Sequence, residues 1–407
     1  MITLRRFITL TCLLAVGCAG DVSAQRGDAA VWGGARAPWS RPDAGTPLAF
    51  VANSRGNSLT VLDLFARRAL ATLPVPVVPL TENGPADLAV DPARGVLYAP
   101  LSLPPPRFMT GPHGDHLAAP VSGLLIKRDL FTMRLLGRLE LEHNPARMVL
   151  SRDRRRAYVS HYDEARARAY MDERAGQLSN VLEVDLDAMT VTRRIPACVI
   201  AQGMCLSADD RTLYVACTGD DALAVIDLAT PSTPRLVPLV DGAPPAGGAP
   251  MLAPYWLSLS PNGGRLWAGL RADADLPLRA FDTARGTWDA QRAVGRLPGA
   301  PQRVGYLTDG TTVLVPTQGP DGLVVLRDGA PPRVERAMMF DEATCARPSQ
   351  IARGPDGLLY LVCAGLWSAE RVAVGAVLAL DPGDLHTVAR YDVGFAPSAI
   401  AFDRGAP

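Results

Sequence analysis

A seven-residue motif occurs seven times along this chain, and the repetition limits the fold more than any other feature of the sequence. Each copy starts with Pro or Ala, continues with alternating apolar residues and leads toward a turn that is usually rich in Asp or Gly. The copies begin at Pro85, Pro145, Ala201, Pro254, Pro301, Pro348 and Pro397, at intervals of 47 to 60 residues. Such a repeat is one supersecondary unit, which buries its apolar surface only against its neighbours.

Three further strand signals accompany the motif in most units. A segment such as "TLYVAC" follows the turn, then a third segment that often ends in Asp, then a weaker fourth. Four short strands per repeat are typical of a β-propeller blade. The first strand signal, at 48–53, is a second strand, and the last, at 397–402, is a lone first strand. The sequence therefore predicts an all-β, seven-bladed β-propeller over residues 46–403. Its blades are four-stranded and antiparallel, and the C-terminal strand joins the N-terminal blade to close the ring.

The segments "LAFVANSRGNSLTVLDL" and "RTLYVACTGDDALAVIDL" resemble YVTN-type β-propeller repeats, which are common in exported bacterial and archaeal proteins. The resemblance covers residues 46–403 and implies the fold. The same fold class includes surface-layer proteins, lactonases, and the propellers of quinoprotein amine dehydrogenases and haem d1 reductases. The resemblance therefore does not identify an activity, because one fold can carry many functions.

The N-terminus has the pattern of an export signal. Two arginines precede a ten-residue apolar-rich stretch, which is too short to span a bilayer as a mature helix, so residues 1–17 are predicted to be a signal peptide. Ala15-Val16-Gly17-Cys18 resembles a bacterial lipobox, which predicts lipidation of Cys18. The alternative is ordinary signal-peptidase cleavage after Ala24.

Residues 18–45 are rich in Gly, Ala, Pro, Arg and Asp without apolar periodicity, and are predicted to form a tether. The expected location is the outer membrane or cell surface as a lipoprotein, with a soluble periplasmic or secreted protein as the alternative.

Two pairs of cysteines recur at equivalent positions of two repeats. Because the first two strands of a blade are antiparallel neighbours, the start of the first lies beside the end of the second. Cys198 and Cys345 each stand three residues before a motif, and Cys217 and Cys363 end the second strand. We expect Cys198–Cys217 and Cys345–Cys363 disulfides, which suit an exported chain. Paired free thiols or a metal site are the alternatives.

The third residue of each motif is expected at the mouth of the central channel. These residues are Asp87, Arg147, Gly203, Trp256, Arg303, Gln350 and Ala399. One acid and two arginines form a funnel able to receive an anion. Asp87, Arg147, Trp256, Arg303 and Gln350 are therefore the candidate binding residues; the alternative is that they only satisfy one another. The whole chain has 41 basic and 41 acidic residues, which gives no reason to expect a nucleic-acid partner.

The longest inserts, at 102–122, 161–180 and 241–254, are expected on one face of the ring, where binding residues often lie. A divalent metal is a further possibility, with four histidines that the blade geometry could bring to this face as ligands. They are His113, His116, His143 and His161. No other cofactor and no catalytic residue is predicted.

The resulting hypothesis is a monomeric binding or scaffold propeller at the cell envelope, which presents its long-loop face to an envelope protein or a small ligand. It would contact the membrane only through its lipid anchor. The alternative is a propeller enzyme with its site in the central funnel, either a lactonase-like hydrolase or an accessory redox subunit.

Overall fold

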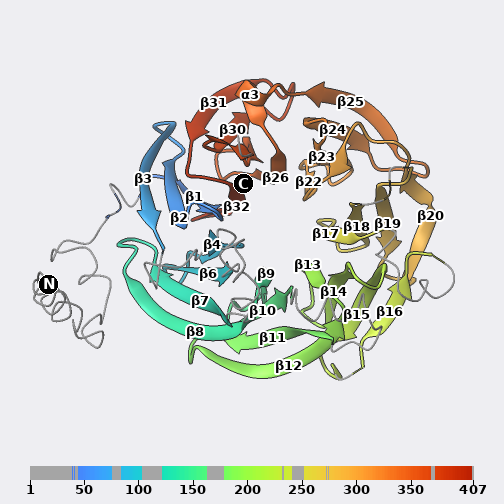
Figure 1. The fold of residues 1–407 in the computed structure, drawn as a ribbon. Helices are drawn as coiled ribbons and strands as arrows, with labels where there is room; N and C mark the ends of the chain where they lie inside the picture. Colours follow the sequence, from blue (N-terminus) through green and yellow to red (C-terminus); the bar gives the residue numbers. More distant parts are fainter. Residues whose placement is uncertain are drawn as a thin grey trace, which may run out of the picture.

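The computed structural model shows seven antiparallel sheets arranged in a ring, as predicted (Figure 1). A small two-stranded hairpin accompanies the seventh sheet. The structure describes residues 39, 41, 45–75, 84–102, 122–162, 178–231, 233–240, 252–271, 273, 275–367 and 372–405. Within these residues no helix is long and apolar enough to cross a membrane.

Blades are numbered here in chain order. Blade 1 contains β1 (Leu48–Asn53), β2 (Ser58–Asp63), β3 (Arg68–Pro74) and β32 (Pro397–Phe402). Blade 2 contains β4 (Gly84–Pro85), β5 (Ala89–Asp91), β6 (Val96–Ser102), β7 (Ser122–Asp129) and β8 (Leu135–His143). Blade 3 contains β9 (Pro145–Leu150), β10 (Arg156–His161), β11 (Ser179–Asp185) and β12 (Thr190–Cys198). Blade 4 contains β13 (Ala201–Leu206), β14 (Thr212–Cys217), β15 (Ala222–Asp227) and β16 (Arg235–Pro238).

Blade 5 contains β17 (Pro254–Leu259), β18 (Arg265–Leu270), β19 (Leu278–Asp282) and β20 (Thr287–Val294). Blade 6 contains β21 (Ala300–Pro301), β22 (Gly305–Tyr306), β23 (Thr312–Gln318), β24 (Gly322–Arg327) and β25 (Arg333–Met339). The single-turn helix α3 (Glu342–Cys345) leads into blade 7. That blade contains β26 (Pro348–Arg353), β27 (Leu359–Cys363), β30 (Ala376–Leu380) and β31 (Thr387–Asp392), with the hairpin β28 (Leu366–Trp367) and β29 (Val372–Ala373).

The ring closes through the last strand. β32 pairs antiparallel with β1, from Ala49 opposite Phe402 to Asn53 opposite Pro397. The predicted closure is confirmed, and blade 1 is therefore assembled from both ends of the chain. The first strand is broken into two short pieces in blades 2 and 6, where the sequence predicts continuous strands.

The core lies between the blades, because the inner strands are covered on both faces. Every residue of β1 and β2 is buried, whereas the outer strand β8 alternates between exposed and partly buried residues along most of its length. An outer edge that faces water on one side gives such an alternation. One apolar cluster of buried residues joins blade 7 to blade 1 through Tyr360, Tyr391 and Val51, so the closing interface has its own apolar core.

The aspartates that end the third strands have a local structural role. The Asp185 carboxylate accepts hydrogen bonds from the backbone N–H groups of Asp187 and Ala188, both at 2.8 Å, and Asp282 accepts equivalent bonds from Ala284 and Arg285 at 3.0 and 2.9 Å. These contacts lower the pKa of Asp185. These aspartates therefore fix the turn to the fourth strand in their blades.

One position at the end of the second strand is buried in every blade. It lies opposite the residue that opens the motif, and its exposed fraction is at most 1%. Its occupants, from blade 1 to blade 7, are Asn53, Leu101, His161, Cys217, Leu270, Thr317 and Cys363. We call this the corner position. In blades 4 and 7 its cysteine forms the predicted disulfide, Cys198–Cys217 and Cys345–Cys363, with Cα atoms 5.7 and 5.2 Å apart.

Two residues of the predicted tether pack on the propeller. Trp39 belongs to the apolar cluster between blades 1 and 2. Arg41 forms an ion pair with Asp403 at 2.6 Å, and Asp403 in turn accepts a hydrogen bond from the Leu48 backbone N–H at 3.0 Å. This contact ties the segment before the first strand to the residue that follows the last one.

Candidate functional site

The channel-mouth residues come from the first strands of different blades. Arg147 lies on β9, Trp256 on β17 and Gln350 on β26, while Asp87 and Arg303 lie in the breaks of the first strands of blades 2 and 6. The register shifts by a bulge near the start of the first strand in blades 1, 3, 4, 5 and 7. A bulge redirects the side chains beside it, and bulges are common next to binding sites.

Asp87 is the centre of the cluster. Its carboxylate is 3% exposed and lies 3.8 Å from the Arg147 guanidinium and 3.7 Å from that of Arg303. It also accepts hydrogen bonds from the backbone N–H groups of Leu88 and Met148, at 3.0 and 3.2 Å. One carboxylate therefore faces two guanidinium groups, and these three side chains together carry one net positive charge.

Arg147 is held on several sides. Its side chain is 12% exposed, donates to the Ala86 carbonyl at 2.9 Å and stacks over Trp256, with 4.0 Å between the guanidinium carbon and the ring centre. Burial lowers the pKa of Arg147 and the charge of Asp87 opposes that shift, but an arginine keeps its proton in such a setting. Trp256 donates its indole N–H to Gln302 at 3.1 Å.

Gly203 leaves room for this contact. A Cβ atom at Gly203 would lie 2.6 Å from the Tyr255 carbonyl oxygen and 3.1 Å from the Trp256 Cα. The backbones of blades 4 and 5 therefore approach one another closely at the mouth, which brings Trp256 within reach of Arg147.

Gln350 and Arg303 connect the last blades to this cluster. The Arg303 backbone N–H donates to the Ser349 carbonyl at 3.1 Å, and Arg303 and Gln350 form an isolated parallel bridge. The Gln350 side chain accepts from the Ile400 backbone N–H at 3.2 Å, so it also contacts the closing strand. The five candidate residues thus lie in one network at the channel mouth.

Two residues of the mouth were missed from the sequence. Tyr255 packs edge-on against Trp256, with ring centres 5.0 Å apart, and Arg271 lies over Tyr255 with its guanidinium carbon 4.5 Å from the ring centre. Tyr255 occupies the bulge between Pro254 and Trp256, so counting every second residue of a regular strand does not place it at the mouth.

The channel wall also carries the free thiol Cys205. It is half-buried on β13. Burial raises the pKa of the Cys205 thiol to about 12, against the opposing positive charge of Arg303. Burial therefore favours the thiol form of Cys205 over the nucleophilic thiolate at neutral pH.

His161 fills the corner position of blade 3. Its Nδ1 lies 3.2 Å from the Asn180 carbonyl oxygen, and its Nε2 is buried without a hydrogen-bond partner. Burial lowers the pKa of His161 to about 4, while the charge of Glu142 opposes the shift. The Asn180 side chain donates to the Glu142 carboxylate at 3.0 and 3.1 Å, so Asn180 links the two residues.

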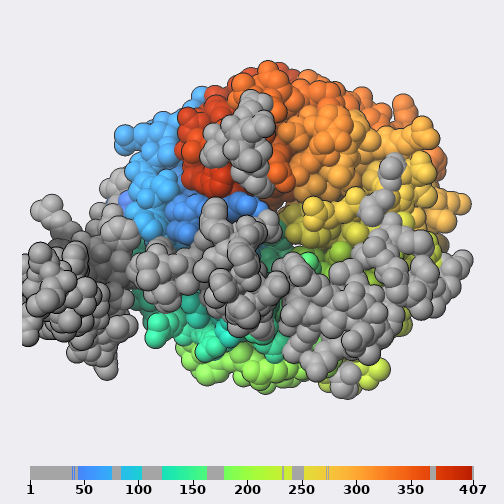
Figure 2. Space-filling model, in the orientation of Figure 1, coloured from blue at the N-terminus to red at the C-terminus, as the bar shows by residue number. Residues whose placement is uncertain are grey.

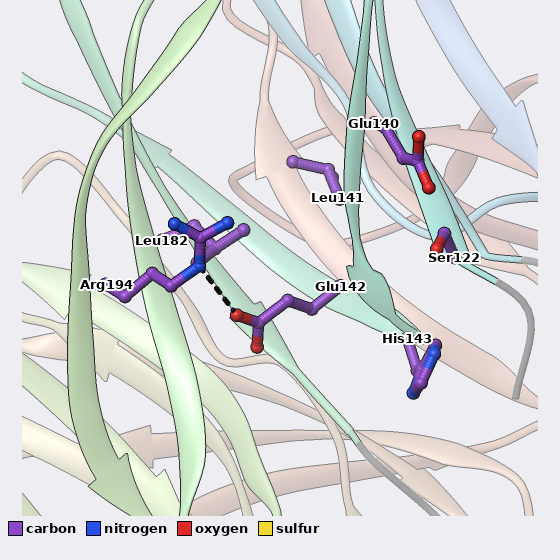
Figure 3. Close-up of a pocket in the computed structure, with 7 residues that line it drawn as sticks. All are labelled: Ser122, Glu140, Leu141, Glu142, His143, Leu182 and Arg194. Atoms are coloured by element: carbon purple, nitrogen blue, oxygen red, sulfur yellow. Dashed lines mark hydrogen bonds and ion pairs between the residues drawn. The ribbon is translucent and has the colours of Figure 1, made fainter.

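A pocket of about 380 Å³ lies beside this corner, between blades 2 and 3 (Figure 3). It is lined by Ser122, Glu140, Leu141, Glu142, His143, Leu182 and Arg194. Figure 3 shows Glu142 pointing toward Arg194, its ion-pair partner at 3.2 Å, while Glu140 points away from that pair. A bulge in the β7–β8 pairing separates the two glutamates, so their carboxylates do not converge on one ligand.

The predicted metal set is only partly within the described residues. His113 and His116 lie outside them, as do most residues of the three long inserts. Within the described part of the chain, neither His143 nor His161 belongs to a group of three potential ligands. The two such groups are Cys198, Cys217 and Asp220, which includes a disulfide, and the largely exposed set Asp381, Asp384 and His386.

The ring of blades in Figures 1 and 2 defines the class of protein, a seven-bladed β-propeller. Solved structures agree over most of the chain. The periplasmic gluconolactonase PpgL of Pseudomonas aeruginosa is 17% identical with a TM-score of 0.61, over 89% of this chain and 100% of that one. Hydrazine synthase of Kuenenia stuttgartiensis is 19% identical with a TM-score of 0.56, over 78% and 89%.

A putative 6-phosphogluconolactonase of Bacteroides uniformis is 14% identical with a TM-score of 0.58, over 88% of this chain and 99% of that one. No family model matches the sequence, and no curated protein matches it. At such low identities these similarities establish the fold alone.

Proposed function

We propose that this chain is an exported binding propeller that receives an anionic small molecule at the channel mouth. The observation that carries the proposal is the shared carboxylate, since Arg147 and Arg303 both face Asp87. Two fixed guanidinium groups with one counter-charge favour a carboxylate or phosphate as the second partner.

Arg303 is the residue that would contact the ligand. Its side chain is 32% exposed, in contrast to the nearly buried Arg147. Its distance of 3.7 Å to Asp87 is longer than a hydrogen bond, so the pair leaves guanidinium N–H donors for another acceptor. Arg147 would add positive charge from its nearly buried position, where Trp256 holds its guanidinium group in place.

The test is calorimetric titration of the purified protein with sodium gluconate, a polyhydroxylated monocarboxylate, at low ionic strength. We expect saturable binding that weakens at least tenfold in Arg303→Gln. Arg285→Gln is the matched control, because Arg285 is exposed on a β19–β20 turn at the opposite end of its blade. Absence of binding, or equal affinities in wild type and Arg303→Gln, would contradict the proposal.

A lactonase-like hydrolase is the second candidate function. The full-length structural similarity to a periplasmic gluconolactonase favours it, as does a mouth that suits a sugar-acid product. Against it, both oxygens of Asp87 already have partners, so this carboxylate is not available as a general base. Hydrolysis of glucono-δ-lactone above the uncatalysed rate, with and without added divalent metal, decides between binding and catalysis. The structural similarity to hydrazine synthase also keeps an accessory redox role as a candidate, but it supports this role less than hydrolysis.

The remaining features of the proposal concern the repeats and the cell envelope. We assign the repeats to the YVTN type on the two quoted segments, and propose lipidation at Cys18 with placement in the outer membrane or at the cell surface. The two disulfides support an oxidising compartment. The long-loop face would meet an envelope protein, with the propeller itself a monomer. Intact mass of protein from native membranes tests the anchor, because a diacylglyceryl mass on Cys18 distinguishes it from cleavage after Ala24.

A divalent metal stays a prediction for His113, His116, His143 and His161. The unpartnered Nε2 of His161 supports it, and the ion pair of Glu142 with Arg194 opposes it. Elemental analysis of chelator-free protein tests it directly.

A further inference from the structure

Four side chains form an unbroken stack that starts at the channel cluster. Arg147 lies 4.0 Å over Trp256, Trp256 packs edge-on against Tyr255 at 5.0 Å, and Arg271 lies 4.5 Å over Tyr255. The stack thus has a cation at each end and two aromatic rings between them. It connects Arg147 on blade 3 with Arg271, the residue that follows β18 on blade 5.

The aromatic rings hold both cations in position. A guanidinium over a ring face at these distances is attracted by the ring electrons, so it is ordered before any ligand arrives. Arg271 is also fixed by its backbone, which donates to the Ala253 carbonyl at 3.1 Å, while its side chain is exposed. Arg271 is therefore an oriented and accessible positive charge.

Arg271 has further basic residues near it. Burial lowers the pKa of Arg347, Asp321 opposes the shift, and the positive charges of Arg55 and Arg271 add to it. The Arg347 backbone N–H donates to the Asp321 carboxylate at 2.8 Å. This bond fixes the chain just before β26. A second positive centre thus lies around Arg271, separated from the Arg147–Arg303 centre by the two aromatic rings.

We propose that the ligand of the channel mouth is an organic dianion, with one carboxylate or phosphate at Arg303 and Arg147 and a second at Arg271. The inference rests on the proposed function and specifies its ligand class. The half-buried Tyr255 lies between the two centres and would contact the uncharged middle of the molecule. Two separated positive centres discriminate by charge number, since a monoanion can satisfy only one of them.

The test compares two six-carbon probes that differ only at C6, where D-gluconate has a hydroxymethyl group and D-glucarate a second carboxylate, by calorimetry at equal ionic strength. Wild type is expected to bind glucarate at least tenfold more tightly than gluconate. Arg271→Gln should weaken glucarate binding at least tenfold and bring the two affinities to within about twofold of each other. Arg303→Gln should weaken both probes, and Arg285→Gln should preserve the wild-type ratio.

The outcomes separate the two proposals. Equal affinities for both probes, or an unchanged ratio in Arg271→Gln, would overturn the dianion inference while gluconate binding keeps the proposed function. If neither probe binds, the proposed function fails and the inference falls with it.

Discussion

Asp87 and Arg303 belong to blades 2 and 6, and their side chains meet at 3.7 Å across the channel. Three blades separate them along one side of the ring and two along the other. Together with the Arg147–Trp256 contact between blades 3 and 5, this pair links opposite sides of the channel mouth through side chains. The mouth is therefore both a site of concentrated charge and a set of contacts between distant blades.

Asp87→Asn is expected to destabilise the protein by about 3 kcal/mol, because it leaves the nearly buried Arg147 without its counter-charge. Chemical denaturation at neutral pH measures the loss. Asp384→Asn is the control, since its carboxylate is 68% exposed, and should shift stability by less than about 0.5 kcal/mol. Equal effects of the two substitutions would show that Asp87 carries no special role at the mouth.

Gly203→Ala should lower the free energy of unfolding by about 1–3 kcal/mol, because the added methyl meets backbone atoms of blade 5 at 2.6 and 2.8 Å. The same substitution at Gly264 should be nearly neutral, since a Cβ there meets only the Asn262 side chain at 3.5 Å or more. Thermal unfolding of both variants decides the matter. An unchanged melting temperature in Gly203→Ala would mean that blades 4 and 5 separate easily.

Removal of the blade 4 disulfide by the double change Cys198→Ser and Cys217→Ser should destabilise the protein by about 3 kcal/mol, as expected for a loop with a sequence separation of 19. The equivalent change at Cys345 and Cys363, with a separation of 18, should have a similar effect. Guanidinium unfolding without reductant measures both. A loss well below this value in either blade would indicate that the corner is held by packing alone.

His161 is expected to make stability depend on pH. Its pKa falls from an ordinary 6.5 to about 4 on folding, so the unfolded chain binds the proton more readily. The neutral imidazole therefore favours the folded state fully above pH 6.5, and this contribution, about 3 kcal/mol, is lost as pH falls toward 4. His161→Leu introduces the residue found at the corner of blades 2 and 5, and should flatten the profile between these pH values.

Unfolding free energies at several pH values provide the measurement for His161. His386→Gln serves as the control, because His386 is exposed and its pKa is raised by the Asp384 hydrogen bond, the opposite direction. If the unfolding free energy of His161→Leu changes with pH in parallel with that of wild type, the loss of stability in acid comes from groups other than His161.

Cys205 should resist alkylation in the folded protein. With its pKa raised to about 12 by burial, almost no thiolate is present at pH 8. Mass spectrometry of the peptide that contains Cys205, after brief treatment with iodoacetamide, should show modification only when denaturant is present. Rapid modification of the native protein would show that the channel wall opens readily at β13.

Much of the fold could be predicted because the repeats fix it. The apolar motif and the Asp that ends most third strands are local signals, and Asp185 and Asp282 show why, since each forms the turn that follows it. The disulfide pairs followed from the register of two antiparallel strands. These features need only the position of a residue within its blade.

The site was less predictable because it depends on departures from regular structure. Tyr255 reaches the mouth through a bulge, and Asp87 and Arg303 lie where the first strand is interrupted. The partners of His161 come from two different blades, and only the assembled ring brings Asn180 between His161 and Glu142. No spacing rule in one strand gives such contacts.

The pairing of β32 with β1 also sets an order of events for a chain that is synthesised from its N-terminus. The hydrogen-bonding edge of Leu48–Asn53 stays open until residues 397–402 have been made. Six blades can form earlier, but the first cannot. An exposed strand edge invites pairing with other chains, so the interval between the synthesis of β1 and that of β32 is when this protein is most open to aggregation and most in need of a chaperone.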